Sequence, residues 1–425
     1  MMCDMYPRID ADSDPAALDA ADPLAGYRDL FALDDAELVY LDGNSLGRPP
    51  RAVAKAVAEL LDGTWRTELV AGWDSWVDLP TIAGDELARS VLGASPGEVL
   101  VADSTSANLY KLAAAALAAA TPDRRVLVTD DDNFPTDRYI LAGIAEQFGA
   151  TLRIVRTDID TGVDPEAVAA AVGADTAVVC LSHVAYRSGA LADMERISAI
   201  ARDAGAFTLW DLCHSAGSVP VELNRCGVDL AVGCTYKYLN AGPGAPAFLY
   251  VRKDLQSRLR QPMWGWFGQT DQFAMGPEYR PVEDIRRFSV GTPPISGITA
   301  VRAALEPTSR AGIGALREKS VALTTYALAL IERRLVPLGF RVATPRDPNL
   351  RGGHVTIEHA KAWQISQAMR RAGIVPDYRA PNRVRLGFAP LYNGFGEIAR
   401  AVEGIADIVA SGAYVEFDDA VSRVT

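Results

Sequence analysis

Short apolar runs rich in β-branched residues alternate with helical segments between residues 98 and 211. Such runs predict strands, and helices of about 10–15 residues between them predict βαβ units. Because these crossovers lay successive strands side by side and parallel, we expect an α/β fold with a mostly parallel sheet flanked by helices. The expected strands are residues 98–102, 125–129, 152–156, 176–182 and 206–211, completed by 228–232 and 247–251. The expected helices are residues 106–120, 135–148, 164–172 and 194–204.

The flanks of this pattern differ from it. Residues 1 to about 40 are acidic and weakly patterned, which predicts an arm with one short helix. Before the alternation, we expect helices at 51–68 and 81–92, with a loop at 74–80. After Gly291-Thr292-Pro293-Pro294 the pattern indicates a smaller α+β unit. In it we expect helices at 298–305, 316–335, 363–372 and 396–411, and strands near 340–343, 353–357 and 383–386. We therefore predict an N-terminal arm (1–50), a large domain (51–300) and a small C-terminal domain (301–425).

Composition excludes several classes of partner. The 425 residues carry a formal net charge of −12, which disfavours nucleic acid and acidic membranes, because both bind basic surfaces. No apolar run approaches the ~18 residues of a membrane-spanning helix, and the N-terminus lacks the pattern of a signal peptide. Five cysteines without CxxC spacing predict reduced thiols and a cytoplasmic protein. The four histidines lack metal-site spacing, so we expect no metal.

Lys237 is the strongest candidate for a catalytic group. It lies between two predicted strands, in a turn rich in Gly and Pro, and the chain has only six lysines. Loss of hydration would make its amine easier to deprotonate, so Lys237 is a candidate Schiff-base nucleophile. An isolated lysine at a strand end is more often a surface residue, but the acid that ends the preceding strand, Asp211, favours the functional reading.

Other polar groups follow the ends of predicted strands. The hydroxyls of Ser104-Thr105-Ser106 begin a helix and could bind a phosphate, although taken alone they would more often be an ordinary helix cap. Phe134 and Asp137 could stack on and hydrogen-bond to a planar heterocycle, or could cap a helix. Asp211, with His214 three residues on, needs a cationic or N–H partner if it is buried, and a protonated pyridine nitrogen would serve.

A further basic group lies in the predicted small domain. Arg385 is suited to bidentate capture of a substrate carboxylate, although taken alone it would more often form a surface ion pair. Together, a phosphate site, a stacking aromatic, an Asp at a strand end and a lysine in a Gly-bordered turn are the parts that hold pyridoxal 5′-phosphate (PLP), which serves as an electron sink.

These residues carry a resemblance to a known family. From residue 41 to about 395 the chain resembles the kynureninases, PLP enzymes of the aspartate-aminotransferase fold (fold type I). The joint order of seven motifs carries the resemblance. They are Asp42-Gly43-Asn44-Ser45-Leu46-Gly47, Asn133-Phe134-Pro135-Thr136-Asp137, Trp210-Asp211-Leu212-Cys213-His214-Ser215-Ala216-Gly217, Tyr236-Lys237-Tyr238-Leu239-Asn240, Gly265-Trp266-Phe267-Gly268, Gly291-Thr292-Pro293-Pro294 and Ala389-Pro390-Leu391-Tyr392-Asn393.

The resemblance implies a role for each candidate. Lys237 would carry the cofactor and shuttle protons, and Asp211, supported by His214, would pair with the pyridine nitrogen. Arg385 would bind the carboxylate of an amino-acid substrate. The remaining cofactor contacts would be Thr105, Ser106 and Tyr236 at the phosphate, Phe134 stacked on the ring beside Asp137, and Ser182.

Trp266 and Thr292 match residues that the family supplies to the cofactor of the neighbouring subunit, which implies a homodimer. The implied reaction is hydrolysis of L-kynurenine to anthranilate and L-alanine in tryptophan catabolism, and Thr292 is the form associated with preference for L-kynurenine over its 3-hydroxy analogue. The alternatives are an aminotransferase or cysteine desulfurase of the same fold, and a PLP-binding homologue without activity.

Overall fold

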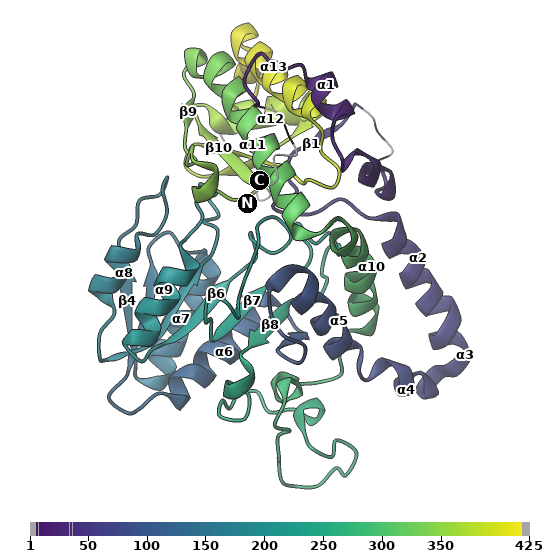
Figure 1. Ribbon diagram of the computed structural model, residues 1–425, viewed down its shortest axis with the longest axis vertical. Helices are drawn as coiled ribbons and strands as arrows, with labels where there is room; N and C mark the ends of the chain where they lie inside the picture. The colour runs from purple at the N-terminus through teal and green to yellow at the C-terminus, as the bar shows by residue number, and fades with distance from the viewer. Residues whose placement is uncertain (1–5, 7, 34, 36, 419–425) are drawn as a thin grey trace.

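A seven-stranded sheet forms the centre of the lower part of the molecule in Figure 1. The computed structural model describes residues 6, 8–33, 35 and 37–418. The strand order is β2-β8-β7-β6-β5-β3-β4, and only the pairs that include β8 are antiparallel. The mostly parallel sheet is therefore confirmed. Its strands are β2 (Val99–Val101), β3 (Val126–Asp130), β4 (Thr151–Val155), β5 (Thr176–Ser182), β6 (Phe207–Asp211), β7 (Leu230–Gly233) and β8 (Phe248–Val251).

Helices cover both faces of this sheet because its strands are apolar on both sides. Leu127 points into one core, whereas its neighbours Val126 and Val128 point into the other, as the period of two in a strand requires. The first core is closed by α6 (Thr105–Ala119) and α7 (Pro135–Phe148). The second is closed by α5 (Leu79–Leu87), α8 (Pro165–Ala171), α9 (Met194–Asp203) and α10 (Ile295–Ala311).

A second unit lies above the large sheet in Figure 1. It has a four-stranded antiparallel sheet of order β12-β13-β10-β9, formed by β9 (Arg341–Val342), β10 (His354–Glu358), β12 (Asp377–Arg379) and β13 (Arg383–Gly387). Its helices are α11 (Ile313–Arg334), α12 (Ala362–Arg371) and α13 (Phe395–Ser411). α10 runs across residue 300, and the division into domains at that residue stays a prediction.

The N-terminal segment packs on this second unit. The predicted short helix is present as α1 (Pro15–Ala20), and the Asp19 carboxylate accepts hydrogen bonds from the first backbone N–H groups of α13, at Phe395 (2.6 Å) and Gly396 (2.9 Å). A carboxylate at a helix N-terminus is favourable because it meets unpaired N–H groups and the positive end of the helix dipole. A parallel pair of short strands, β1 (Val39–Tyr40) and β11 (Ile374–Val375), adds a second connection.

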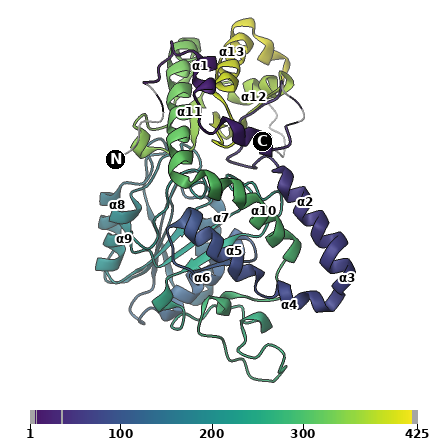
Figure 2. The same cartoon turned by 45° about the vertical axis from the view of Figure 1, so that its right-hand side comes forward.

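Residues 51–76 form a helical arm at the side of the molecule (Figure 2). α2 (Arg51–Leu60) leads through one irregular turn to α3 (Arg66–Glu68) and α4 (Trp73–Trp76). The loop expected at 74–80 is wrong, because most of it is helical. The rings of Trp73 and Trp76 meet edge to face at 5.6 Å within α4, and Trp73 also meets the ring of Phe267 at 6.0 Å, which joins this short helix to the body. Among the described helices, none combines the length and the apolarity needed to cross a bilayer.

Candidate active site

Lys237 follows β7 in a turn held by backbone hydrogen bonds to two of its carbonyl groups. The carbonyl of Tyr236 accepts a hydrogen bond from Gly47 N–H (2.8 Å), and that of Lys237 accepts one from Asn240 N–H (2.9 Å). A Cβ atom on Gly47 would lie 2.4 Å from the Lys237 carbonyl oxygen, so only glycine permits this approach. The turn at residues 42–47 therefore fixes the backbone of the lysine from the N-terminal segment.

The Lys237 amine lies 3.0 Å from Nε2 of His214. Burial lowers the pKa of His214 well below its usual value, so the ring is neutral and can accept a hydrogen bond from the amine. The amine is also 6.0 Å from the ring centroids of both Phe134 and Tyr236. We expected His214 to support Asp211. Its ring instead contacts Lys237, because the turn after β6 directs it toward β7.

Two carboxyl groups meet where β6 ends and α7 begins, those of Asp211 and Asp137. Asp211 accepts a hydrogen bond from Cys213 N–H (2.8 Å). Burial, together with the charge and hydrogen bonding of Asp211, raises the pKa of Asp137 well above its usual value. Asp137 therefore favours its protonated form, since two adjoining buried carboxyls do not both ionise. Oδ2 of Asp137 and Nδ1 of His214 are buried without a hydrogen-bond partner among the described residues.

The N-terminus of α6 lies next to these acids. Ser104 is the N-cap, and its hydroxyl accepts a hydrogen bond from Ala107 N–H (3.3 Å). The cap is thus Ser104, which leaves Thr105 and Ser106 as the first two helical residues. The Thr105 hydroxyl is 3.7 Å from Sγ of Cys213, two residues after Asp211. A helix start with free N–H groups and hydroxyls is suited to a phosphate.

Ser182 and Asn133 support the loop that carries Phe134. The Ser182 hydroxyl donates to Oδ1 of Asn133 (2.6 Å), which also accepts from Phe134 N–H (2.8 Å). The Asn133 amide in turn donates to the Thr129 hydroxyl (2.9 Å). In the structure the Ser182 hydroxyl braces this loop, and its predicted contact with the cofactor stays a prediction. Asn133 was not singled out from sequence.

Arg385, on β13, brings the second unit to the site. It is 1% exposed, so a surface ion pair is wrong for this residue. Its guanidinium pairs with the buried Asp377, and it donates to the Tyr186 carbonyl (2.5 Å) and the Ser45 hydroxyl (3.1 Å). The Tyr186 ring meets Phe134 edge to face at 5.4 Å, which places Arg385 near the predicted stacking residue. Asp377 and Tyr186 carry no sequence signal of their own.

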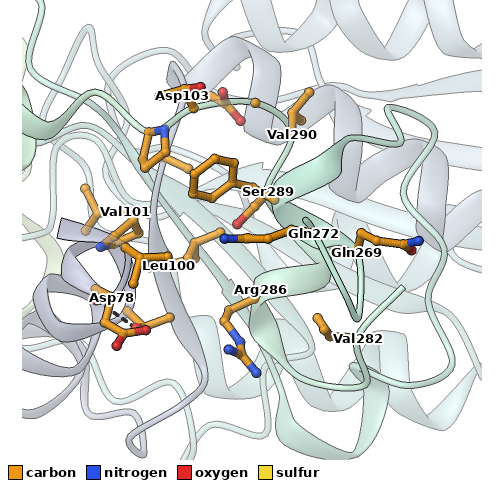
Figure 3. Close-up of a pocket in the computed structure, with 18 of the residues that line it drawn as sticks. Asp78, Leu100, Val101, Asp103, Gln269, Gln272, Val282, Arg286, Ser289 and Val290 are labelled. Carbon is orange, nitrogen blue, oxygen red and sulfur yellow. Dashed lines mark hydrogen bonds between the residues drawn. The ribbon is translucent and has the colours of Figure 1, made fainter. Parts of the chain in front are cut away.

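Trp266 and Thr292 are both exposed on the surface of the chain. Trp266 is 39% exposed and packs on Phe267, with ring centroids 4.5 Å apart. Thr292 is exposed and lines a cavity of about 230 Å³ at the edge of the large sheet, shown in Figure 3. That cavity also includes Asp103, which immediately precedes the helix cap Ser104. The structure therefore leaves both residues available to another molecule.

The donor set fits PLP. The site offers an amine, a carboxylate paired with a protonated acid, an aromatic face and a helix N-terminus. The unpartnered buried atoms of Asp137 and His214 are those that a polar heterocycle would satisfy. Among the described residues, no group of three or more His, Cys, Asp or Glu side chains could hold a metal ion.

The similarity of the chain to known proteins decides its family. It is 44% identical over 405 residues to the kynureninase of Pseudomonas fluorescens, covering 93% of this chain and 95% of the relative. It is 43% identical over 403 residues to that of Burkholderia pseudomallei strain K96243, covering 94% and 95%. The chain belongs to the kynureninase family. The model of the kynureninase C-terminal domain matches residues 316–405, and the model of the DegT/DnrJ/EryC1/StrS aminotransferase family matches residues 92–227.

Solved structures show the same fold at lower identity. The apo cysteine desulfurase of Thermococcus onnurineus NA1 has a TM-score of 0.77 at 19% identity, covering 96% of this chain and 99% of the other. The cystine C-S lyase C-DES with its product cysteine persulfide has a TM-score of 0.78 at 20% identity, covering 88% and 98%. The fold is thus that of fold-type-I PLP enzymes, and the kynureninase family uses PLP.

Proposed function

We propose that this chain hydrolyses L-kynurenine to anthranilate and L-alanine with PLP bound at Lys237. One observation carries the proposal beyond family membership. The Lys237 amine is held 3.0 Å from a neutral imidazole, close to the Asp137–Asp211 acid pair. An amine oriented by a hydrogen bond to a neutral imidazole is placed to bind an aldehyde covalently and, once released from it, to move protons at the substrate. When bound, PLP supplies an electron sink for the bond that breaks.

The surrounding residues divide the remaining tasks. Asp211 keeps the cofactor nitrogen protonated, and Phe134 stacks on the ring. Thr105 and Ser106, at the start of α6, bind the phosphate together with Tyr236. Arg385 binds the substrate carboxylate, since its guanidinium is buried and oriented by Asp377. In the overall reaction the Cβ–Cγ bond of the substrate breaks. The carbonyl carbon Cγ gains the oxygen of water and becomes the carboxylate of anthranilate, and Cβ gains one proton and becomes the methyl group of alanine.

The desulfurase alternative finds little support in the cysteines. Cysteine desulfurases need a thiol that can reach substrate, whereas the four described cysteines, Cys180, Cys213, Cys226 and Cys234, are buried. Burial also raises the pKa of Cys180 and Cys226, which makes their thiolates scarce. Cys3 lies outside the described residues.

The proposed enzyme is a homodimer in which each subunit contributes Trp266 and Thr292 to its partner. Large apolar side chains are exposed on the helical arm and on the loop near Trp266, which is typical of an interaction surface. They include Trp65 (57% exposed), Leu69 (63%), Val70 (80%), Phe273 (70%) and Met275 (72%). We place the enzyme in the cytoplasm, in tryptophan catabolism with L-kynurenine preferred over its 3-hydroxy analogue.

Product analysis tests the proposed reaction. Purified protein with added PLP is incubated with L-kynurenine, and anthranilate and alanine are measured. We expect both in equal amounts, whereas a keto acid with the amino group left on the cofactor would identify an aminotransferase. Lys237→Ala should lose both the visible absorbance of bound cofactor and turnover, and Lys253→Ala, the same change at an exposed lysine, should keep both. Retention of turnover in Lys237→Ala would refute the assignment of Lys237 as the residue that binds PLP. A complete lack of turnover in the wild type would instead support a PLP-binding homologue without activity.

A further inference from the structure

Lys111 is a buried lysine for which the proposed chemistry has no use. It lies on α6, six positions after Thr105, and its side chain is 0% exposed. Its amine donates to Oδ2 of Asp103 (2.6 Å) and to the backbone carbonyl of Phe288 (2.8 Å). A lysine is costly to bury, and burial lowers its pKa, so the two acceptors are needed to keep it in place.

The first contact of Lys111 acts on the helix start in its own chain. Asp103 has a φ of +51°, a left-handed conformation that is uncommon for residues other than glycine. It directly precedes the cap Ser104, so its conformation sets where the chain enters α6. The ion pair with Lys111 holds Asp103 in this conformation and thereby orients Thr105 and Ser106.

The second contact acts on a different segment. Phe288 ends a short 3₁₀ helix (Ile285–Phe288), four residues before Thr292. The next segment packs closely on the loop of Trp266, since a Cβ atom on Gly265 would lie 1.8 Å from the Val290 carbonyl oxygen. Val290 and Asp103 both line the cavity at the sheet edge shown in Figure 3. The Phe288 carbonyl therefore fixes the position of both residues predicted to serve the partner subunit.

We propose that Lys111 is a positioning residue that joins the two halves of the cofactor site. Through Asp103 it orients the phosphate-binding helix start of its own subunit. Through Phe288 it orients the segment that carries Trp266 and Thr292 to the partner's cofactor. This inference rests on the proposed shared dimer. It makes cofactor binding in one subunit depend on a lysine of the other.

Cofactor affinity measures the effect. Lys111→Met removes the charge and both hydrogen bonds while keeping an unbranched side chain only one heavy atom shorter. Loss of one charge-assisted hydrogen bond corresponds to about a tenfold or greater rise in the cofactor dissociation constant. The matched control is Lys319→Met, which breaks another buried lysine–aspartate pair, with Asp22 (2.6 Å), in the second unit. It should lower thermal stability and leave cofactor affinity unchanged.

Mixed dimers separate the two halves. In a dimer with one Lys237→Ala subunit, only the other subunit holds cofactor covalently. When Lys111→Met is in the Lys237→Ala subunit, the intact site is affected only through the segment that this subunit supplies to it. When the change is in the intact subunit, the intact site is affected only through its own helix start. We expect weaker cofactor binding in both cases, relative to the mixed dimer without the change. Asp103→Asn, which leaves the Phe288 contact in place, should weaken binding only from within the intact subunit.

Unchanged affinity when Lys111→Met is placed in the Lys237→Ala subunit would overturn the coupling, as would an equal effect of Lys319→Met. A monomer in solution would overturn both the coupling and the shared site. Because the readout is binding of PLP, failure to cleave L-kynurenine would refute the proposed reaction and leave this result intact.

Discussion

Exchanging the two adjoining acids one at a time tests which of them carries the charge at the cofactor nitrogen. Asp137→Asn and Asp211→Asn each replace a carboxyl with a neutral amide of the same shape. Because the pKa of Asp137 is raised well above its usual value by burial and by Asp211, Asp137 is already neutral. Its amide replacement can still donate a hydrogen bond, so we expect less than about a threefold loss of kcat/KM.

The same exchange at Asp211 removes a charge. Its hydrogen bond from Cys213 N–H (2.8 Å) survives in Asp211→Asn, because the amide keeps an oxygen, so the local fold should hold. A hydrogen bond to a charged group is worth about 1.5–3 kcal/mol, and about 1.4 kcal/mol is a factor of ten in rate. We therefore expect a loss of kcat/KM of about 10- to 100-fold, together with weaker cofactor binding.

Steady-state kinetics with saturating PLP and a cofactor titration measure both variants. Circular dichroism of the proteins without cofactor checks that they fold. The pH dependence of the free energy of unfolding is an independent test. A carboxyl with a raised pKa in the folded state loses stability as pH rises above its unfolded value, so Asp137→Asn should gain stability over the wild type, increasingly so toward neutral pH. Equal losses of activity in the two variants, or a less stable Asp137→Asn at neutral pH, would refute the protonated state assigned to Asp137.

Three further changes test other parts of the structure. Burial raises the pKa of Asp130 to about 7, so the wild type should lose stability as pH rises from about 4 to about 7. Asp130→Asn should remove that loss, which is at most about 4 kcal/mol, in denaturant titrations across this range. If the free energies of unfolding of the two proteins changed in parallel with pH, this assignment would be wrong. Arg385→Lys keeps the charge beside Asp377 but loses the fork geometry, so KM for substrate should rise about tenfold with a smaller change in kcat; an unchanged KM would argue against carboxylate binding. Gly265→Ala should weaken cofactor binding by displacing Val290. Gly276→Ala is the control, because no atom lies within 4 Å of the added Cβ, and it should leave cofactor binding unchanged. Equal cofactor affinities of the two variants in PLP titrations would rule out this packing role.

Local patterns were sufficient to predict the large sheet. The strand at 176–182 and the helix at 135–148 begin and end where predicted, because each has a strong period and clear boundaries. The short strands β1, β11 and β12 were not predicted. Their two or three residues carry no period, and β1 and β11 exist because Val39 and Ile374, far apart in sequence, pair side by side.

The candidate site was predictable where a functional residue follows a strand. Lys237 and Asp211 were found in this way, since parallel neighbours such as β6 and β7 end at the same edge of the sheet. Asn133 belongs to one of the family motifs but was given no role of its own, and Lys111 carried no signal in the sequence. Their importance depends on partners such as Ser182 and Phe288, which are distant in sequence and carry no matching signal.

The amino-acid sequence alone determined the succession of strands and helices along the chain, because hydrophobic period and turn chemistry are local properties. For parallel strands, that succession also indicates which loops meet at one edge of the sheet. Only the tertiary structure decided how the charged groups pair. It placed His214 against Lys237, brought Asp137 against Asp211 and buried Arg385 against Asp377. Those outcomes depend on desolvation and on distances between side chains, which only the folded chain brings into existence.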